Sequence, residues 1–427
     1  MDTQSEWNQL VFETNKPSKW WHQRRAKIIG ISFAIFVALT ISVVLILEFS
    51  IWSPKNSYST TTTTAQPSVW RSTGNMNTQR EGHVAILLKN GKVLVTGGSD
   101  HGSCAFICEL YDLETGNWTI TGNMSIDRCE HTMSILTNGK VLVAGGGSGT
   151  AEIYDPSFGI WTPTVRMNEG RHGHTASVLT DGKVLVVGGG TDSAEVYDPS
   201  TGNWTSTNSM HTQRYDHIAA VLTNGKVLVA GGSELDYDGI MDSCELYDPL
   251  TEMWTVTAKM SHRRMQHTAS VLTNGKVLVT GGLDDMRRYV KISELYDPLT
   301  ETWTITGNMS FPRAQHTASV LRNGKVLVTG GLAESLIRYS TELYDPATGI
   351  WMVANNMNHV RVLHTATELE NGNVLVAGGD GGDNSAINSA ELYISPKTIS
   401  ATINKKNNPP NGHNAPMAKR TLNKDGY

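Results

Sequence analysis

Residues 316–351 read HTASVLRNGKVLVTGGLAESLIRYSTELYDPATGIW, and this stretch carries the signals that decide the fold. Two short runs with β-branched residues, HTASVL and KVLVTGG, flank Asn323-Gly324. Asn-Gly between such runs is the strongest short-range signal for a β-hairpin, and we expect positive φ at both turn residues. A loop, a third run at Glu342-Leu343-Tyr344, an Asp-Pro turn and a fourth run from Trp351 complete the unit. The stretch therefore predicts a four-stranded antiparallel sheet.

This pattern occurs seven times in the 427-residue chain. A pair of glycines marks each copy: Gly97-Gly98, Gly145-Gly146, Gly188-Gly189, Gly231-Gly232, Gly281-Gly282, Gly330-Gly331 and Gly378-Gly379. A near-constant period in the forties indicates an array of one supersecondary unit. One such sheet cannot bury both of its faces, whereas sheets stacked around an axis can. We therefore expect an all-β protein, a seven-bladed β-propeller of four-stranded antiparallel blades.

The two ends of the array complement each other. Trp70, in VWRSTGNM, matches the fourth strand of a repeat, as in NWTITGNM at 117–124, but no preceding strands accompany it. The last repeat, with Glu391-Leu392-Tyr393, lacks a tryptophan after it. The Trp70 strand is thus predicted to complete the last blade and to close a ring over residues 68–395, which removes exposed sheet edges.

The recurring GG, Y-D-P and W resemble the kelch family of propellers, and the wording NGKVLVTGG…AELYDPxTGxW is most similar to kelch repeats of the galactose-oxidase type. The resemblance implies the propeller fold but only weakly a function. Those copper oxidases use a Tyr-His ligand pair at one repeat, a Tyr crosslinked to Cys, and a His from a C-terminal β-domain. No tyrosine precedes any of the seven histidines here, and 396–427 is too short for that domain. We expect no oxidase activity, no catalytic residues, no cofactor and no metal.

An Arg-x-x-His motif opens every copy, and a glutamate precedes every third-strand tyrosine. The motifs are Arg80/His83, Arg128/His131, Arg171/His174, Arg214/His217, Arg264/His267, Arg313/His316 and Arg361/His364, and the glutamates are Glu109, Glu152, Glu195, Glu245, Glu294, Glu342 and Glu391. A residue that every blade repeats usually belongs to the scaffold, so we interpret Arg264, Glu294 and His267, like Trp70, as structural. We expect arginine–glutamate pairs of bidentate geometry, and histidines that satisfy backbone groups at strand ends.

Four cysteines give three possible pairings. Cys104 and Cys108 share one loop, and Cys129 enters the next blade on the same face. Cys244 matches the register of Cys108 three blades later. We expect Cys104 to pair with Cys108 or Cys129, leaving Cys244 free, whereas a zinc site lacks the usual C-x2-C spacing.

Residues 28–47, Ile28 to Leu47, form an uncharged run of 20, long enough to span a bilayer as a helix. A buried core helix has no place in a propeller, and a cleavable signal peptide would be shorter and followed by small residues. Basic residues concentrate on the N-terminal side: Lys16, Lys19, Arg24, Arg25 and Lys27, against Lys55 alone on the other. By the positive-inside rule, 1–27 is cytoplasmic and the propeller extracellular or lumenal, as in a single-pass signal-anchor protein.

The flanks of the propeller are polar. The 48–67 segment contains the Ser/Thr run SYSTTTTT and reads as a stalk, and 396–427 reads as a disordered tail. Four N-x-[ST] sequons mark candidate glycosylation sites, although chance and the repeat itself also generate them: Asn117, Asn123, Asn203 and Asn308. Net charge −5 without a basic stripe excludes a nucleic-acid partner.

Variation among blades is concentrated after the paired glycines. Blades 2 and 3 have five residues before the glutamate, and the other blades have ten to twelve. These loops share a face with the Arg-x-x-His turns, and their tyrosines and arginines are candidate ligand-face residues: Tyr237, Arg287, Arg288, Tyr289, Arg338 and Tyr339. Solvated loops also vary freely. We expect a membrane-anchored recognition module for a protein or glycan; a divergent carbohydrate oxidase and an intracellular kelch scaffold are the alternatives.

Overall fold

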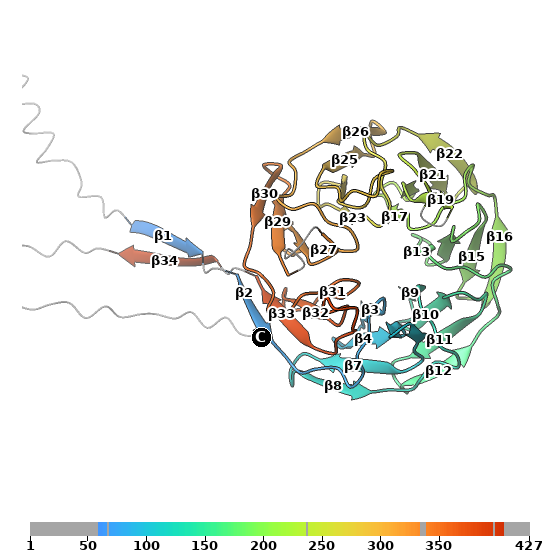
Figure 1. Ribbon diagram of the computed structural model, residues 1–427, viewed down its shortest axis with the longest axis horizontal. Helices are drawn as coiled ribbons and strands as arrows, with labels where there is room; N and C mark the ends of the chain where they lie inside the picture. The colour runs from blue at the N-terminus through green and yellow to red at the C-terminus, as the bar shows by residue number, and fades with distance from the viewer. Residues whose placement is uncertain (1–58, 66–67, 236–237, 334–338, 396–397, 405–427) are drawn as a thin grey trace, which may run out of the picture. The chain divides into compact units, whose positions relative to one another are not determined.

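The computed structural model describes residues 59–65, 68–235, 238–333, 339–395 and 398–404. Contacts divide the chain into two units, of which Ala65–Lys397 is the propeller. Figure 1 shows seven four-stranded sheets arranged around an axis. The all-β, seven-bladed architecture expected from the repeats is confirmed.

In blades 1 to 6 the strands follow one another along the chain from the centre to the rim, whereas blade 7 takes its rim strand from the N-terminal end of the propeller (Figure 1). Blades 1 to 3 comprise β3 (Val84–Leu87), β4 (Val93–Thr96), β7 (Cys108–Asp112) and β8 (Asn117–Ile120); β9 (His131–Ile135), β10 (Val141–Gly145), β11 (Ala151–Asp155) and β12 (Ile160–Pro163); β13 (Thr175–Val178), β14 (Val184–Val187), β15 (Ala194–Asp198) and β16 (Asn203–Thr207). Blades 4 to 6 comprise β17 (Ile218–Val221), β18 (Val227–Ala230), β21 (Cys244–Asp248) and β22 (Met253–Thr257); β23 (Thr268–Val271), β24 (Val277–Thr280), β25 (Ser293–Asp297) and β26 (Thr302–Ile305); β27 (Thr317–Val320), β28 (Val326–Thr329), β29 (Thr341–Asp345) and β30 (Ile350–Val353). Blade 7 comprises β31 (Thr365–Glu368), β32 (Val374–Ala377), β33 (Ala390–Ile394) and β2 (Val69–Ser72).

The ring is continuous because each innermost strand contacts its two neighbours, and β31 contacts β3. The closing strand is β2, which pairs with β33 so that Trp70 lies opposite Tyr393 and Val69 opposite Ile394. The N-terminal strand thus completes the last blade, as the two ends of the array predict. Trp70 is 9% exposed and packs on Tyr393 of the same blade.

The core lies between blades. The second strand of each blade begins Val-Leu-Val and is buried along its whole length, as in β4 and β24. Such a strand is apolar on both faces because a neighbouring blade covers each face. At the rim, each tryptophan packs on the tyrosine of its own third strand and donates its indole N–H to the preceding blade, as Trp118 does to the Gly74 carbonyl at 2.8 Å.

The Asn-Gly and Asp-Gly hairpins form in all seven blades, but the predicted turn type is wrong. Only the glycine has positive φ, for example +80° at Gly91. The Gly91 N–H donates to the Leu88 carbonyl, and the Leu88 N–H donates to the Lys92 carbonyl. This is a type I turn followed by a left-handed residue, because the loop is one residue longer than a two-residue hairpin.

A separate two-stranded sheet pairs β1 (Ser59–Ala65) with β34 (Thr398–Asn404). Residues 398–404 therefore differ from the disordered tail expected over 396–427, because the Thr- and Ile-rich sequence TISATIN suits a strand. Within the described residues no helix is long and apolar enough to cross a membrane. The segments 1–27 and 28–47, and most of the 48–67 stalk, lie outside the described residues.

Candidate recognition face

The loops after the paired glycines and the Arg-x-x-His turns lie on one face of the ring, here called the loop face. Single antiparallel bridges join the two segments within a blade, such as Glu81–Ser99, Tyr215–Ser233 and Met265–Leu283. The opposite face, here called the turn face, carries the Asn-Gly and Asp-Pro turns. This assignment agrees with the alternation of turns expected in a meander.

A buried arginine closes the base of each loop on the loop face. In blade 5, Arg264 Nη1 donates to the carbonyl of Gly281 at 2.9 Å and to that of Ile292 at 3.0 Å, the two residues that bracket the loop. Its Nη2 donates to Glu294 Oε1 at 2.8 Å. Both side chains are fully buried, so the arginine ties the two ends of the loop to each other and to the third strand.

The same clamp occurs in every blade, whatever the length of its loop. The pairs of bracketing carbonyls, in blade order, are Gly97 and Ile107, Gly145 and Thr150, Gly188 and Ser193, Gly231 and Ser243, Gly281 and Ile292, Gly330 and Ser340, and Gly378 and Ser389. Each arginine contacts its glutamate through one nitrogen only, so the expected bidentate pairing is wrong. The second nitrogen is occupied by the two carbonyls.

The glutamate of each clamp also binds the segment that leads into the Arg-x-x-His motif. Glu294 Oε2 accepts the Ser261 N–H at 2.7 Å, and Oε1 accepts the His262 N–H at 3.2 Å. Burial lowers the pKa of Arg264, and the Glu294 carboxylate opposes that shift. Arg264 and Glu294 are therefore partners in a buried ion pair, and the loop is the element that they hold.

The seven histidines join neighbouring blades. Six place Nε2 within 3.1 Å of a threonine hydroxyl of the preceding blade, as His217 does with Thr175 at 2.9 Å. In these six the Nε2 partner is a side chain; the strand-end backbone groups that we expected act on His174 and His267, through Ala144 and Ala230. The exception is His267, 6% exposed, because Ile218 occupies the place of the threonine. Burial is the main cause that lowers the pKa of His131, His174, His217 and His364 to about 3, so these rings are neutral.

On the loop face, backbone hydrogen bonds link several of the residues that precede the motif histidines in neighbouring blades. The residue before each motif histidine has φ between +50° and +60°. The Gln266 N–H donates to the Asp216 carbonyl at 3.2 Å, and the Gln315 N–H donates to the Gln266 carbonyl at 3.1 Å. These positions differ in side chain from blade to blade: Gly82, Glu130, Gly173, Asp216, Gln266, Gln315 and Leu363. The mouth of the axis is thus a rigid frame with variable side chains.

The blade-5 loop is held in one conformation by its own residues. Asp284 accepts the backbone N–H groups of Met286 and Arg288 at 2.9 Å, and it pairs with the Arg288 guanidinium at 2.7 Å. A bridge joins Leu283 to Tyr289. The tip presents Met286, which is 69% exposed. A rigid loop loses little conformational entropy when it binds a partner.

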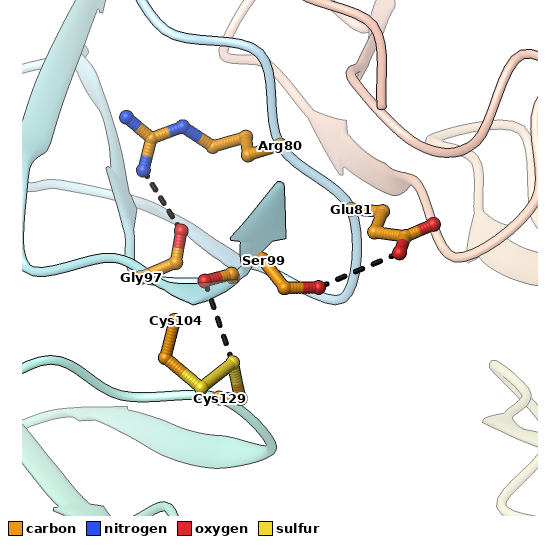
Figure 2. Close-up of a disulfide and its surroundings, with 7 residues drawn as sticks. Arg80, Glu81, Gly97, Ser99, Cys104 and Cys129 are labelled. Atoms are coloured by element: carbon orange, nitrogen blue, oxygen red, sulfur yellow. Dashed lines mark hydrogen bonds between the residues drawn. A yellow bond between two sulfur atoms is a disulfide. The ribbon is translucent and has the colours of Figure 1, made fainter. Parts of the chain in front are cut away.

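The blade-1 loop is fixed covalently. Its hairpin, β5 (Ser99–Asp100) with β6 (Ser103–Cys104), is joined to blade 2 by the Cys104–Cys129 disulfide. Figure 2 shows the disulfide beside the Arg80–Gly97 contact and the Ser99 hydroxyl that faces Glu81. Cys108 and Cys244 are free and buried, and burial raises the pKa of both thiols to about 12. The pairing is one of the two expected, and Cys244 is free as expected.

The predicted ligand-face residues differ in their environments. Arg287 and Arg288 are exposed and Tyr289 is half-buried in the blade-5 loop, whereas Tyr339 packs against the core between blades 6 and 7. Tyr237 and Arg338 lie outside the described residues. The sequence reasoning missed the exposed Met286 and Phe106, because it selected only tyrosine and arginine. The candidate glycosylation residues Asn117, Asn123, Asn203 and Asn308 are all exposed.

The chain enters and leaves the propeller on the turn face. Val69 of β2 pairs with Ile394 of β33, so both ends lie at the same end of one blade. The Ser395 hydroxyl donates to the carbonyl of Gly372, which belongs to the Asn-Gly turn of blade 7. The connections of the propeller are therefore on the face opposite the variable loops.

Copper chemistry of the galactose-oxidase kind would need ligands near the axis. Within the described residues, no three His, Cys, Asp or Glu side chains are grouped so that they could hold a metal ion. Six of the seven motif histidines are instead bound to threonines, and none of the seven has a tyrosine before it. The residues present do not fit that copper site.

Comparison with known proteins supports the fold assignment. The attractin/LZTR1 β-propeller family model matches residues 195–407, and the kelch motif matches 83–125 and 171–211. A solved structure of a fungal alcohol oxidase of the AA5 family, in complex with copper, is similar with a TM-score of 0.61 at 20% identity, covering 78% of this chain and 76% of that one. No curated protein matches the sequence significantly. The repeats, the closed ring of blades and these matches together show that the chain belongs to the kelch-repeat β-propellers.

Proposed function

We propose that this protein is a membrane-anchored recognition module that binds a protein partner through the loop face on the extracytoplasmic side. The observation that carries the proposal is the contrast between loops and clamps. Loops of five to twelve residues differ in every blade, and one repeated arginine clamp holds them all. Kelch propellers generally mediate protein interactions.

The distribution of loop length gives the face a tall side and a low side. Blades 2 and 3 have short loops, and blades 4, 5 and 6 have long ones. The exposed Met286 and the two neighbouring arginines project from blade 5. An apolar side chain beside arginines is typical of residues that dominate protein interfaces. This composition favours a protein over a glycan as the partner.

The position of the chain ends supports the proposed orientation. The first and last propeller residues, near Val69 and Ile394, both lie on the turn face, so the loop face carries neither chain connection. Exposed sequons at Asn117, Asn123, Asn203 and Asn308 are compatible with an extracellular or lumenal propeller.

Glycosidase treatment of the full-length protein from cells tests the orientation. We expect a mobility shift after N-glycan removal, and loss of the shift when the four sequon asparagines are replaced by glutamine. Cytosolic protease access to the propeller without a shift would instead support the intracellular scaffold alternative.

A loop exchange tests the loop face. Replacing 283–293 by GSGTA, the blade-2 loop 147–151, keeps the two carbonyls that the clamp binds, so the protein should fold. Partners recovered by proximity labelling with the wild-type protein should be lost with this variant. The control exchanges the blade-3 loop 190–194 for the same GSGTA and should retain them. Equal labelling by both variants would exclude the blade-5 loop.

The carbohydrate-oxidase alternative rests on the AA5 alcohol oxidase, whose similarity at 20% identity shows the fold alone. Copper content and peroxide production on sugars and primary alcohols would separate the two functions. Stoichiometric copper with turnover would favour the oxidase over the recognition module.

A further inference from the structure

The fourth strands form the rim of the propeller, and each presents one unpaired edge to solvent. Proteins usually keep such edges polar, because a flat apolar edge pairs with other strands. Six of the seven rim strands follow this rule at their middle outward position, and only β30 departs from it with Met352. The others have Arg71, Thr119, Thr162, Thr205, Thr255 and Thr304.

The β30 edge is apolar along its whole length. Ile350, Met352 and Val353 are 57%, 45% and 56% exposed, whereas Trp351 is buried against its own blade. No Asp, Glu, Lys or Arg occurs from 346 to 360, and Asp345, which lies opposite Ile350 on β29, is paired with Lys325 at 3.0 Å. By contrast, β8 and β16 each begin with a sequon asparagine, Asn117 and Asn203.

The register of β30 shows which backbone groups are available. The Ala354 N–H donates to the Thr341 carbonyl, and Leu343 lies opposite Met352. Because hydrogen-bonded pairs alternate in an antiparallel ladder, Met352 and Ile350 direct their backbone groups toward β29. Trp351 and Val353 therefore direct theirs toward the open edge.

These groups are self-complementary. If two β30 strands meet antiparallel with Met352 opposite Met352, Trp351 of one copy faces Val353 of the other, and the reverse holds by symmetry. Each of these two pairs can exchange both of its N–H···O=C bonds. The apolar side chains then cover one another, and the absence of charge removes any repulsion between identical strands.

We propose that β30 is a docking edge for a second copy of this chain, which forms a two-fold symmetric dimer through antiparallel β30–β30 pairing. The dimer joins propellers at the rim and leaves the loop face of each copy open. This inference does not depend on the membrane anchor or on the partner of the loop face.

Cysteine crosslinking tests the pairing directly. In a non-hydrogen-bonded antiparallel pair the Cα atoms are about 4.5 Å apart, within disulfide range. Full-length chains with two different tags, each carrying Met352→Cys, should give a disulfide-linked dimer that contains both tags under mild oxidation. The matched control is Thr304→Cys, at the equivalent register of β26, where Thr304 lies opposite Leu295. This control should still pair through β30 but should give no disulfide-linked dimer.

A second pair of variants separates pairing from folding. Met352→Lys should abolish co-purification of the two tags, and Thr304→Lys should leave it unchanged. Both residues are exposed, so the two melting temperatures should match that of the wild type. Equal crosslinking at positions 352 and 304, crosslinking of Met352→Cys only to other proteins, or no crosslink at all would each overturn the proposal.

Discussion

The clamps and the loops lie on the same face of the propeller, yet the blades repeat them very differently. The arginine and the first glycine of the pair are always 17 residues apart, as in Arg264 and Gly281. The arginine-to-glutamate separation varies from 24 to 31 residues, because the loop lies between them. Because the arginine clamp is constant and only the loop after the paired glycines varies, the residues that would contact a partner can change without disturbing the core. The predictions below test this separation of roles.

Removal of the closing strand should have the largest effect. Deleting 68–75 removes β2 and leaves the edge of β33 unpaired, so the propeller should lose cooperative unfolding and aggregate. Light scattering and differential scanning calorimetry measure both. A monomeric protein with an unchanged melting profile would contradict ring closure as the basis of stability.

The second largest effect is expected from acid, which should destabilise the folded propeller by protonating the inter-blade histidines. Their pKa values are lowered in the folded state, to about 3 for His217, so the unfolded chain binds more protons below pH 6.5. Stability should fall as pH drops from 6.5 toward 3, by up to about 1.4 kcal/mol per pH unit for each histidine. Urea unfolding between pH 7 and 4.5 measures the slope. A flat profile would mean that these rings are accessible to protons.

Substitutions of two arginines in blade 5 compare the contribution of the clamp to stability with that of the loop. Arg264→Ala should cost about 3–5 kcal/mol, since it leaves the buried Glu294 charge and two carbonyls without their partner. Arg288→Ala removes an exposed pair with Asp284 and should cost far less stability than Arg264→Ala. Chemical denaturation of both variants gives the comparison. Similar losses in the free energy of unfolding for the two variants would show that the buried clamp contributes no more to stability than the exposed ion pair.

A smaller effect than that of Arg264→Ala is expected at a single hydroxyl between blades. Thr175→Val keeps the shape of the side chain but removes the group bound to His217, and should cost about 1–3 kcal/mol. Thr175→Ser keeps the hydroxyl, so it should retain more of the stability than Thr175→Val. Thermal unfolding should give a higher melting temperature for Thr175→Ser than for Thr175→Val. The reverse order would show that Thr175 stabilises the protein by packing and not by its hydrogen bond.

Much of this architecture could be predicted from the sequence. The period of the paired glycines gave the seven blades, and the unmatched Trp70 strand indicated the closure. The turn type was missed, because Asn90-Gly91 suits two turns and only the hydrogen-bond register distinguishes them. The loop clamp was missed as well, although the constant spacing of 17 residues from arginine to glycine was visible in the sequence. Which atoms an arginine contacts depends on tertiary geometry that spacing alone does not provide.

The closing strand also determines how the propeller would respond to force. β2 is the first strand of the ring in sequence, and its partner β33 is the last, so both chain ends leave from one end of the same pair. When Ser68 is pulled away from the body of the ring, the force acts along β2. The hydrogen bonds between β2 and β33 then share the load in shear. Tension that separates Ser68 from Ser395 acts across the pair and breaks the bonds one after another. The seam that makes the ring stable is thus strong against a pull along one end and weak against the separation of its two ends.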